Sequence, residues 1–163
     1  MHATSSTAEA MRDVGVWWAV AGGWAIDLWL GEQTREHHDV EVVVQRCDQA
    51  AVHDSLCARW ELFCLDPPGE GWRSWSGHPL RPPAFQLQAR SATFEFDIFT
   101  ETTETTETTE TTETTETTET PETTDRATWY FRRDRRISRP LADVTTIGVG
   151  GLPIVRPEVQ LLY

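Results

Sequence analysis

The chain has 163 residues and a mass of 18.5 kDa, the size of one domain, and 39% of its residues are hydrophobic, including eight Trp. This composition supplies enough apolar surface for a core and excludes a chain that is disordered throughout. The formal net charge is −12, but eight glutamates lie in one repeat, and the remainder carries about −4, an ordinary value for a soluble domain.

No apolar run is long enough for a transmembrane helix, and the N-terminal segment MHATSSTAEAMRD lacks the basic and apolar regions of a signal peptide. We therefore expect a cytoplasmic protein that does not enter a membrane. Cys47, Cys57 and Cys64 form no Cys-x-x-Cys pair, so neither a disulfide framework nor a zinc knuckle is indicated. All 14 basic residues are Arg, so any basic phosphate contact must come from a guanidinium group.

The first half of the chain predicts a strand, a glycine turn and a helix. Cap candidates and good helix formers favour a first helix over 5–14. Residues 17–21 are typical of a buried strand, which runs into Gly22-Gly23, a dipeptide that lets the backbone turn sharply. The mostly apolar stretch 24–30 then predicts a short helix.

Alternating strands dominate the middle of the chain. Residues 39–45, DVEVVVQ, alternate with a period of two, and 48–59 predict a helix with Asp48 as its N-cap. Residues 60–65 predict another strand, and a loop rich in Pro and Gly follows. The segments 84–90 and 93–99 both alternate, so we expect them to pair as antiparallel strands.

Residues 101–124 carry a Glu-Thr-Thr repeat that is interrupted only by Pro121 and contains no other apolar residue. Such a segment buries nothing that would offset its ordering entropy, so we expect a solvated, disordered loop. Strand character resumes at Ala127, and the repeat is therefore interpreted as the long loop of a hairpin. A last helix is expected to start at Pro157. Together these elements predict an α/β (α+β) domain over 1–163, with a mixed sheet flanked by helices.

Asp39 and Glu41 are the first candidates for chemistry, because residues two apart on a strand project from the same face. Two carboxylates on one rigid face repel each other unless a cation lies between them. The alternative is the solvated face of an amphipathic strand. Asp97, within FEFDIF, is a third strand-borne acid, although periodicity does not place it near Asp39.

Two further features could bind phosphate. Gly22-Gly23 between a strand and a helix start could direct backbone N–H groups at an anion, or be an ordinary turn. The cluster of Thr34, Arg35, His37 and His38 could bind phosphate or tune a metal site, or lie at the surface.

The stretch WAVAGGWAIDLWLGEQTREHHDVEVVV resembles the signature of the DNA polymerase β-like nucleotidyltransferases, and most closely that of the aminoglycoside 2″-adenylyltransferase group. The matching positions are Gly22, Gly23, Trp24, Ala25, Ile26 and Asp27, then Thr34, Arg35 and His37, then Asp39 and Glu41. Glu41 departs from the Asp that is commoner there.

This resemblance implies that Asp39, Glu41 and Asp97 bind one or two Mg²⁺, with Asp97 also the candidate general base. It implies that Gly22 and Gly23 hold the triphosphate of the donor ATP. Arg35 is a candidate for an additional phosphate contact, with His37 beside it. The implied reaction transfers AMP to a hydroxyl group of a small acceptor, with an aminoglycoside as one candidate, and releases pyrophosphate.

Two other hypotheses remain open at this stage. One is a minimal nucleotidyltransferase of the toxin–antitoxin type that acts on protein or RNA and has a partner protein. The other is an inactive remnant that binds nucleotide at most, because relatives usually continue into C-terminal helices while this chain ends at Tyr163. Neither a membrane nor duplex nucleic acid is an expected partner.

Overall fold

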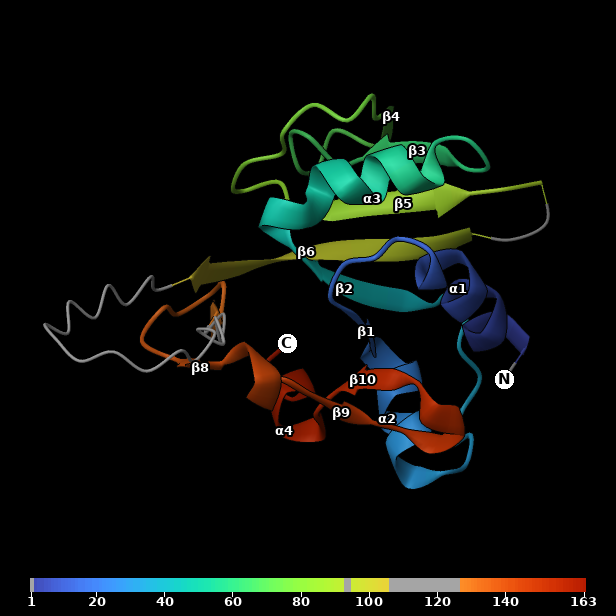
Figure 1. The fold of residues 1–163 in the computed structure, drawn as a ribbon, viewed down its shortest axis with the longest axis vertical. Coiled ribbons are helices and arrows are strands. Elements are labelled where there is room, and N and C mark those ends of the chain that lie inside the picture. Colours follow the sequence, from blue (N-terminus) through green and yellow to red (C-terminus); the bar gives the residue numbers. More distant parts are fainter. Residues whose placement is uncertain (1, 93–94, 106–126) are drawn as a thin grey trace, which may run out of the picture.

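A computed structural model describes residues 2–92, 95–105 and 127–163 (Figure 1). The helices are α1 His2–Arg12, α2 Gly22–Leu30, α3 Gln49–Leu56 and α4 Pro157–Gln160, with the 3₁₀ turns η1 Arg46–Asp48, η2 Leu141–Asp143 and η3 Val149–Gly151. The strands are β1 Trp18–Ala21, β2 Glu41–Gln45, β3 Glu61–Cys64, β4 Arg73–Ser74, β5 Gln86–Arg90, β6 Glu95–Thr105, β7 Ala127–Tyr130, β8 Ser138–Pro140, β9 Thr145–Ile147 and β10 Pro153–Val155.

These strands form one mixed sheet in the order β4-β3-β5-β6-β2-β1-β10-β9, and β7 and β8 extend from the far end of β6. β2 lies parallel to β6 and antiparallel to β1, and β1 lies parallel to β10. The mixed α+β fold that the sequence predicts is therefore confirmed. β6, β2 and β1 lie next to one another in this order near the centre of the sheet. β2 and β6 carry candidate site residues, and β1 leads into Gly22.

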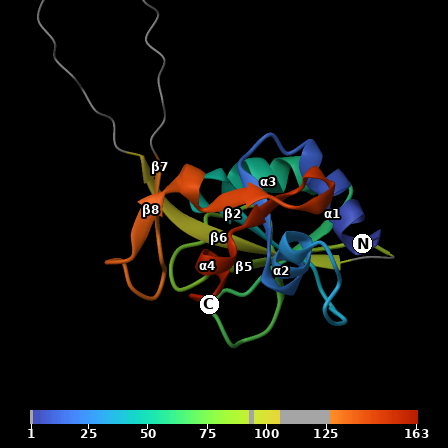
Figure 2. The same ribbon diagram turned by 90° about the horizontal axis from the view of Figure 1, so that it is seen from below.

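The first face of the sheet is covered by α1, α2 and α3. Val42, Val44 and Ile98 point to this side and are fully buried, as alternation along β2 and β6 requires. Met11 of α1 and Leu56 of α3 pack into the same cluster. Figure 2 shows α1 and α3 on one side of the sheet and α4 on the other. The first face is therefore filled by the core, and the candidate site lies on the opposite face.

The second face is covered by the C-terminal part of the chain. Val43 and Val155 point to this side and pack with Trp129 of β7, Val144 and Val159 of α4. Glu41 follows the same alternation, so its side chain also points to this second face. The candidate site therefore lies between the sheet and the segment that carries α4.

Most predicted elements are confirmed, with small shifts in their bounds. α3 starts at Gln49, and Asp48 occupies the N-cap position but makes no side-chain capping bond. β5 pairs antiparallel with β6, as the alternation of both segments predicts. β2 begins at Glu41, so Asp39 precedes the strand instead of lying on it, and this part of the prediction was wrong.

The repeat differs from its prediction at its N-terminal end. β6 continues through Glu101 to Thr105, and β7 pairs with it antiparallel from Thr102 onward. The hairpin between these segments is confirmed, but the first five repeat residues belong to a strand and not to a loop. Glu101 is only 3% exposed, because Trp129 and Tyr163 cover it. The rest of the predicted loop, residues 106–124, lies outside the described residues.

Cys47, Cys57 and Cys64 are free thiols, in line with the sequence. Within residues 2–92, 95–105 and 127–163, no helix is long and apolar enough to cross a membrane.

Candidate active site

Glu41 and Asp97 lie side by side at the centre of the sheet. β2 and β6 run parallel with Glu41 opposite Asp97, and the Asp97 N–H donates to the carbonyl of Val40 at 2.9 Å. Residues that are opposite each other on neighbouring strands project from the same face. The register thus brings together two of the three carboxylates that the sequence singles out.

Both carboxyl groups have a raised pKa. Burial is the main cause for Glu41, and repulsion from Asp39 and Asp97 adds to it, while Arg132 and Arg35 act in the opposite direction. Burial also dominates for Asp97, where hydrogen bonds from two glutamines oppose the repulsion from Asp39. Like charges held in a half-buried site favour the binding of a cation or a proton.

Two glutamines of the neighbouring strand hold Asp97. Gln88 Nε2 donates to Asp97 Oδ1 at 2.8 Å, and Gln86 Nε2 donates to Oδ2 at 3.3 Å. Gln88 lies directly opposite Asp97 on β5. These bonds fix the carboxylate plane and leave lone pairs on both oxygens for another ligand. Gln86 and Gln88 could have been inferred from the sequence, because they alternate on a strand expected to pair with the one that carries Asp97.

Asp39, the third predicted carboxylate, is less closely associated with Glu41 and Asp97 than these two are with each other. Its side chain is exposed, and it stands just before β2, near enough to raise the pKa of both other acids. Among the described residues, no three His, Cys, Asp or Glu side chains are arranged to hold a metal ion. The oxygen donors of the Glu41 and Asp97 pair nevertheless fit a hard cation such as Mg²⁺, which prefers a few carboxylates and keeps its other ligands as water or phosphate.

Gly22 places the start of α2 against Glu41. Its φ is +64°, a left-handed conformation that side chains disfavour, and a Cβ there would overlap Glu41 Oε2 and lie 2.9 Å from Cδ. The Gly22 N–H donates to Gln160 Oε1 of α4 at 2.9 Å. Glycine is thus required at this position for two independent reasons, and its amide lies beside the carboxylate pair.

Gly23 is equally close to side chains of the following loop. A Cβ there would overlap the His37 ring and come within 2.7 Å of Arg35 Nη2. Arg35 is exposed, and its charge also lowers the pKa of Glu41. The guanidinium group therefore lies near both the N-terminus of α2 and the carboxylate pair, where a phosphate contact is physically favourable.

His37 has a structural partner that the sequence did not assign. Its Nε2 lies 2.6 Å from Oδ2 of the buried Asp27, and Thr34 Oγ1 donates to Asp27 Oδ1 at 2.6 Å. Burial alone would raise the pKa of Asp27, but the hydrogen bonds from Thr34 and His37 hold it below its ordinary value. The ring also packs against Trp24, with 4.8 Å between centroids. These contacts tie the loop after α2 to the helix, while the exposed His38 lies outside this network.

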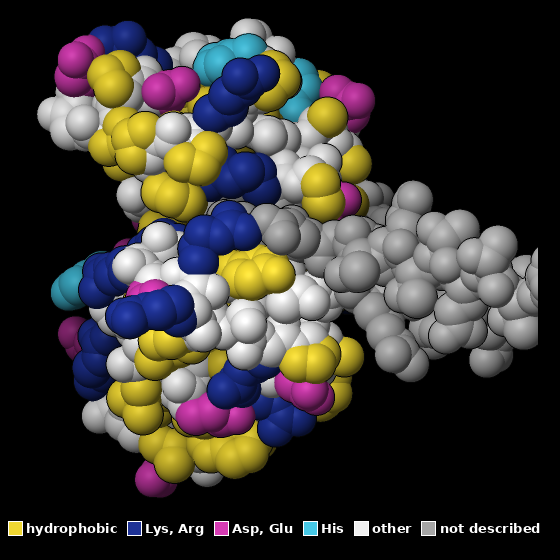
Figure 3. All heavy atoms as spheres, turned by 90° about the vertical axis from the view of Figure 1, so that its left-hand side faces the viewer, with side chains coloured by type: hydrophobic (Ala, Val, Ile, Leu, Met, Phe, Trp, Pro, Cys, Tyr) yellow, Lys and Arg dark blue, Asp and Glu magenta, His cyan; other side chains and the backbone are white. Residues whose placement is uncertain are grey.

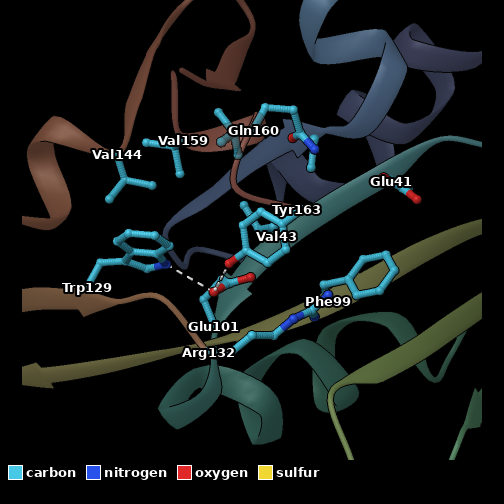
Figure 4. Close-up of a pocket in the computed structure, with 12 residues that line it drawn as sticks. Glu41, Val43, Phe99, Glu101, Trp129, Arg132, Val144, Val159, Gln160 and Tyr163 are labelled. Carbon is cyan, nitrogen blue, oxygen red and sulfur yellow. Dashed lines mark hydrogen bonds between the residues drawn. The ribbon is translucent and has the colours of Figure 1, made fainter. Parts of the chain in front are cut away.

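A pocket of about 310 Å³ opens next to the carboxylate pair, on the same face of the sheet (Figure 4). Glu41 and Gln160 lie toward one end, and Trp129 lies toward the other. Glu101 and Arg132 are its charged residues besides Glu41. This pocket was not predicted from the sequence, although Asp97, Phe99 and Glu101 continue the same alternation and so share one face.

Comparison with known proteins agrees with this geometry. Residues 5–60 match the family model of aminoglycoside-2″-adenylyltransferase. Among solved structures, the chain is similar to the lincosamide antibiotic adenylyltransferase LnuA bound to lincomycin, with 14% identity, 99% of this chain and 84% of that chain covered, and a TM-score of 0.59. It is also similar to a protein of Thermotoga maritima assigned as a nucleotidyltransferase, with 8% identity, 99% and 80% coverage, and a TM-score of 0.50.

No curated protein sequence matches the chain. The fold is that of a nucleotidyltransferase and is related to the fold of aminoglycoside adenylyltransferases, as the sequence resemblance implies. The matched residues 5–60 include Gly22, Gly23 and Glu41, and so contain one side of the candidate site. Family match and fold together support a nucleotidyltransferase enzyme.

Proposed function

We propose that this chain transfers AMP from ATP to a hydroxyl group of a small antibiotic acceptor and releases pyrophosphate. The observation that carries the proposal is the Glu41–Asp97 pair, held in register on two parallel strands beside the amide of Gly22. Transfer of a nucleotidyl group depends mainly on positioning and charge neutralisation, which is what such a site supplies.

Each side chain has a defined part in this reaction. Asp39, Glu41 and Asp97 would hold one or two Mg²⁺, which when bound neutralise charge on the phosphate oxygens. Asp97 is the proposed general base, since Gln86 and Gln88 hold its carboxylate in place and leave lone pairs on both oxygens to accept a proton. The amides of Gly22 and Gly23 and the guanidinium of Arg35 would bind the phosphates.

His37 belongs to this proposal as a positioning residue. Its bond to Asp27 and its contact over Gly23 keep the loop that carries Arg35 against the start of α2. A direct phosphate contact from His37 would use Nδ1, because Nε2 already faces Asp27.

The comparisons support two candidate acceptor classes. The matched family takes its name from aminoglycosides, and the similar LnuA is bound to lincomycin. Aminoglycosides and lincomycin are both small molecules that carry hydroxyl groups. A cytoplasmic location, which the sequence predicts, would place the chain together with its donor ATP.

The test is pyrophosphate release from Mg·ATP in the presence of kanamycin, tobramycin or lincomycin. We expect release with at least one acceptor and its loss by more than a hundredfold in Asp97→Asn. Glu95→Gln is the matched control, because it removes an exposed carboxylate from the same face of β6; Glu95 pairs with Arg90 and acts on Asp97 only through its charge. Release that is equal in Asp97→Asn and the wild type would contradict the proposed site.

A further inference from the structure

The pocket on the carboxylate face continues the site along the strands. Glu101 lies four residues after Asp97 on β6, opposite Gln45 of β2, which corresponds to about 13 Å along the strand. This separation is comparable with the span from the α-phosphate of a nucleotide to the far edge of its base. The pocket also includes Gln160, whose Oε1 accepts the Gly22 N–H. The end of the pocket that includes Gln160 therefore lies next to the Gly22 amide, which is proposed to bind phosphate.

The walls of the pocket combine flat aromatic side chains with polar groups. Phe99, Trp129 and Tyr163 supply aromatic surface, and Val43 and Val155 line the floor from the sheet. The guanidinium of Arg132 lies 4.7 Å from the ring centroid of Tyr163 and 5.7 Å from that of Phe99. Aromatic rings and arginine planes are the surfaces on which nucleobases stack.

The pocket carries charges of both signs. The positive charge of Arg132 lowers the pKa of Glu41 and so partly offsets that carboxylate, while Glu101 supplies a second acid to the lining. Figure 3 shows basic side chains spread over the face that carries β8, with acidic ones among them. The planar guanidinium of Arg132 offers a surface on which a nucleobase can stack.

Glu101 presents one oxygen to the pocket. Trp129 Nε1 donates to Glu101 Oε2 at 3.0 Å, and the Tyr163 hydroxyl donates to the same oxygen at 2.8 Å. Burial and the nearby Glu101 raise the pKa of Tyr163, so its hydroxyl keeps the proton that it donates. Both donors bind Oε2, so the second carboxylate oxygen, Oε1, receives neither of these hydrogen bonds. A carboxylate only accepts hydrogen bonds, so this oxygen selects a partner with an N–H group.

The geometry points to this pocket as the binding site for the base of the donor nucleotide, with Glu101 accepting a hydrogen bond from its exocyclic amino group. This inference rests on the proposed function, because the phosphates must lie at Gly22 for the base to reach Glu101. Gln160 then gives up the Gly22 amide to a phosphate oxygen when the nucleotide binds.

Equilibrium binding with three Mg²⁺-bound probes tests this inference: ATP, purine riboside triphosphate, which lacks only the amino group, and inorganic tripolyphosphate. In the wild type we expect ATP to bind about tenfold or more tightly than purine riboside triphosphate. In Glu101→Gln the two donors at Oε2 hold the amide oxygen, so the NH₂ group faces the base. We expect the preference for ATP to disappear in this variant while tripolyphosphate affinity stays unchanged.

Fluorescence of the wild type supplies a readout that does not depend on how Glu101→Gln folds. ATP should quench Trp129, tripolyphosphate should not, and the ATP response should be lost in Trp129→Phe. An ATP preference that persists in Glu101→Gln, or equal quenching by ATP and tripolyphosphate, would overturn the base site and leave the proposed function standing. Absence of binding by ATP and tripolyphosphate alike would overturn both.

Discussion

At the scale of single residues, the contact between Gly22 and Glu41 is the most sensitive point of the site. Gly22→Ala adds a Cβ that overlaps the Glu41 carboxylate in a backbone of positive φ. Gly15 has a similar φ of +72°, but a Cβ there meets no atom within 4 Å, so Gly15→Ala carries the conformational cost alone.

We expect Gly22→Ala to lower the free energy of unfolding by about 1 to 3 kcal/mol and Gly15→Ala by about 1 to 2 kcal/mol. Urea denaturation measures both. Mg·ATP binding should weaken about tenfold or more in Gly22→Ala only, because Glu41 must move. Equal ATP affinity in the two variants would show that Glu41 does not need this space.

The raised pKa of Glu41 gives a prediction about stability and pH. A carboxyl group whose pKa is higher in the folded state stabilises the fold fully below its unfolded pKa, and this contribution is lost as the pH rises through the folded pKa. Without metal, the wild type should therefore lose stability between about pH 4 and neutrality.

Replacing Glu41 by a neutral side chain should remove this loss of stability at neutral pH. We expect Glu41→Gln to raise the Tm at pH 7.5 without metal by a few degrees, while nucleotidyl transfer is lost. Glu61→Gln, on the exposed side of β3, should leave the Tm unchanged. Mg²⁺ should raise the Tm of the wild type but not that of Glu41→Gln. A lower Tm for Glu41→Gln would mean that the carboxylates are not in mutual repulsion.

At the scale of elements, the bond between Asp27 and His37 joins α2 to the loop that follows it. Both side chains are 3% exposed, whereas the corresponding pair Asp54 and His53 on α3 has Asp54 82% exposed. We expect Asp27→Asn to lower the free energy of unfolding by about 1 to 3 kcal/mol because buried partners lose their charge-assisted bonds. Asp54→Asn should change it by less than about 0.5 kcal/mol.

The pH dependence of this effect has the opposite sign to that of Glu41. The pKa of Asp27 is lowered, so its contribution is present above the unfolded pKa and is lost as the pH falls through the folded value. Chemical denaturation at pH 7 and pH 3 should show the difference between wild type and Asp27→Asn shrinking in acid. A difference that is constant with pH would contradict the assignment of a charged Asp27.

The strands also show which structural features could be predicted from the sequence and which could not. Alternation with a period of two predicted the faces of β2, β5 and β6, because side-chain direction in a strand is a local property. It did not predict that Glu41 lies opposite Asp97, since strand register is set by packing between distant segments. Glu101 was missed because the composition of the repeat suggested a loop, although the alternation of β6 runs through it.

At the scale of the whole molecule, the C-terminal segment completes the site that the N-terminal half begins. Residues 5–60, which match the family model, supply Gly22 and Glu41, while Asp97, Glu101 and Tyr163 come from later in the chain. The mixed sheet brings these parts together through the parallel pairing of β2 with β6 and of β1 with β10.

Pyrophosphate release from Mg·ATP with aminoglycoside and lincosamide acceptors tests this assembly most directly. We expect acceptor-dependent release in the wild type and in Glu95→Gln, and none above background in Asp97→Asn or Glu41→Gln. No release with any acceptor, together with no Mg²⁺-dependent ATP binding by the wild type, would contradict the assignment of this site to nucleotidyl transfer.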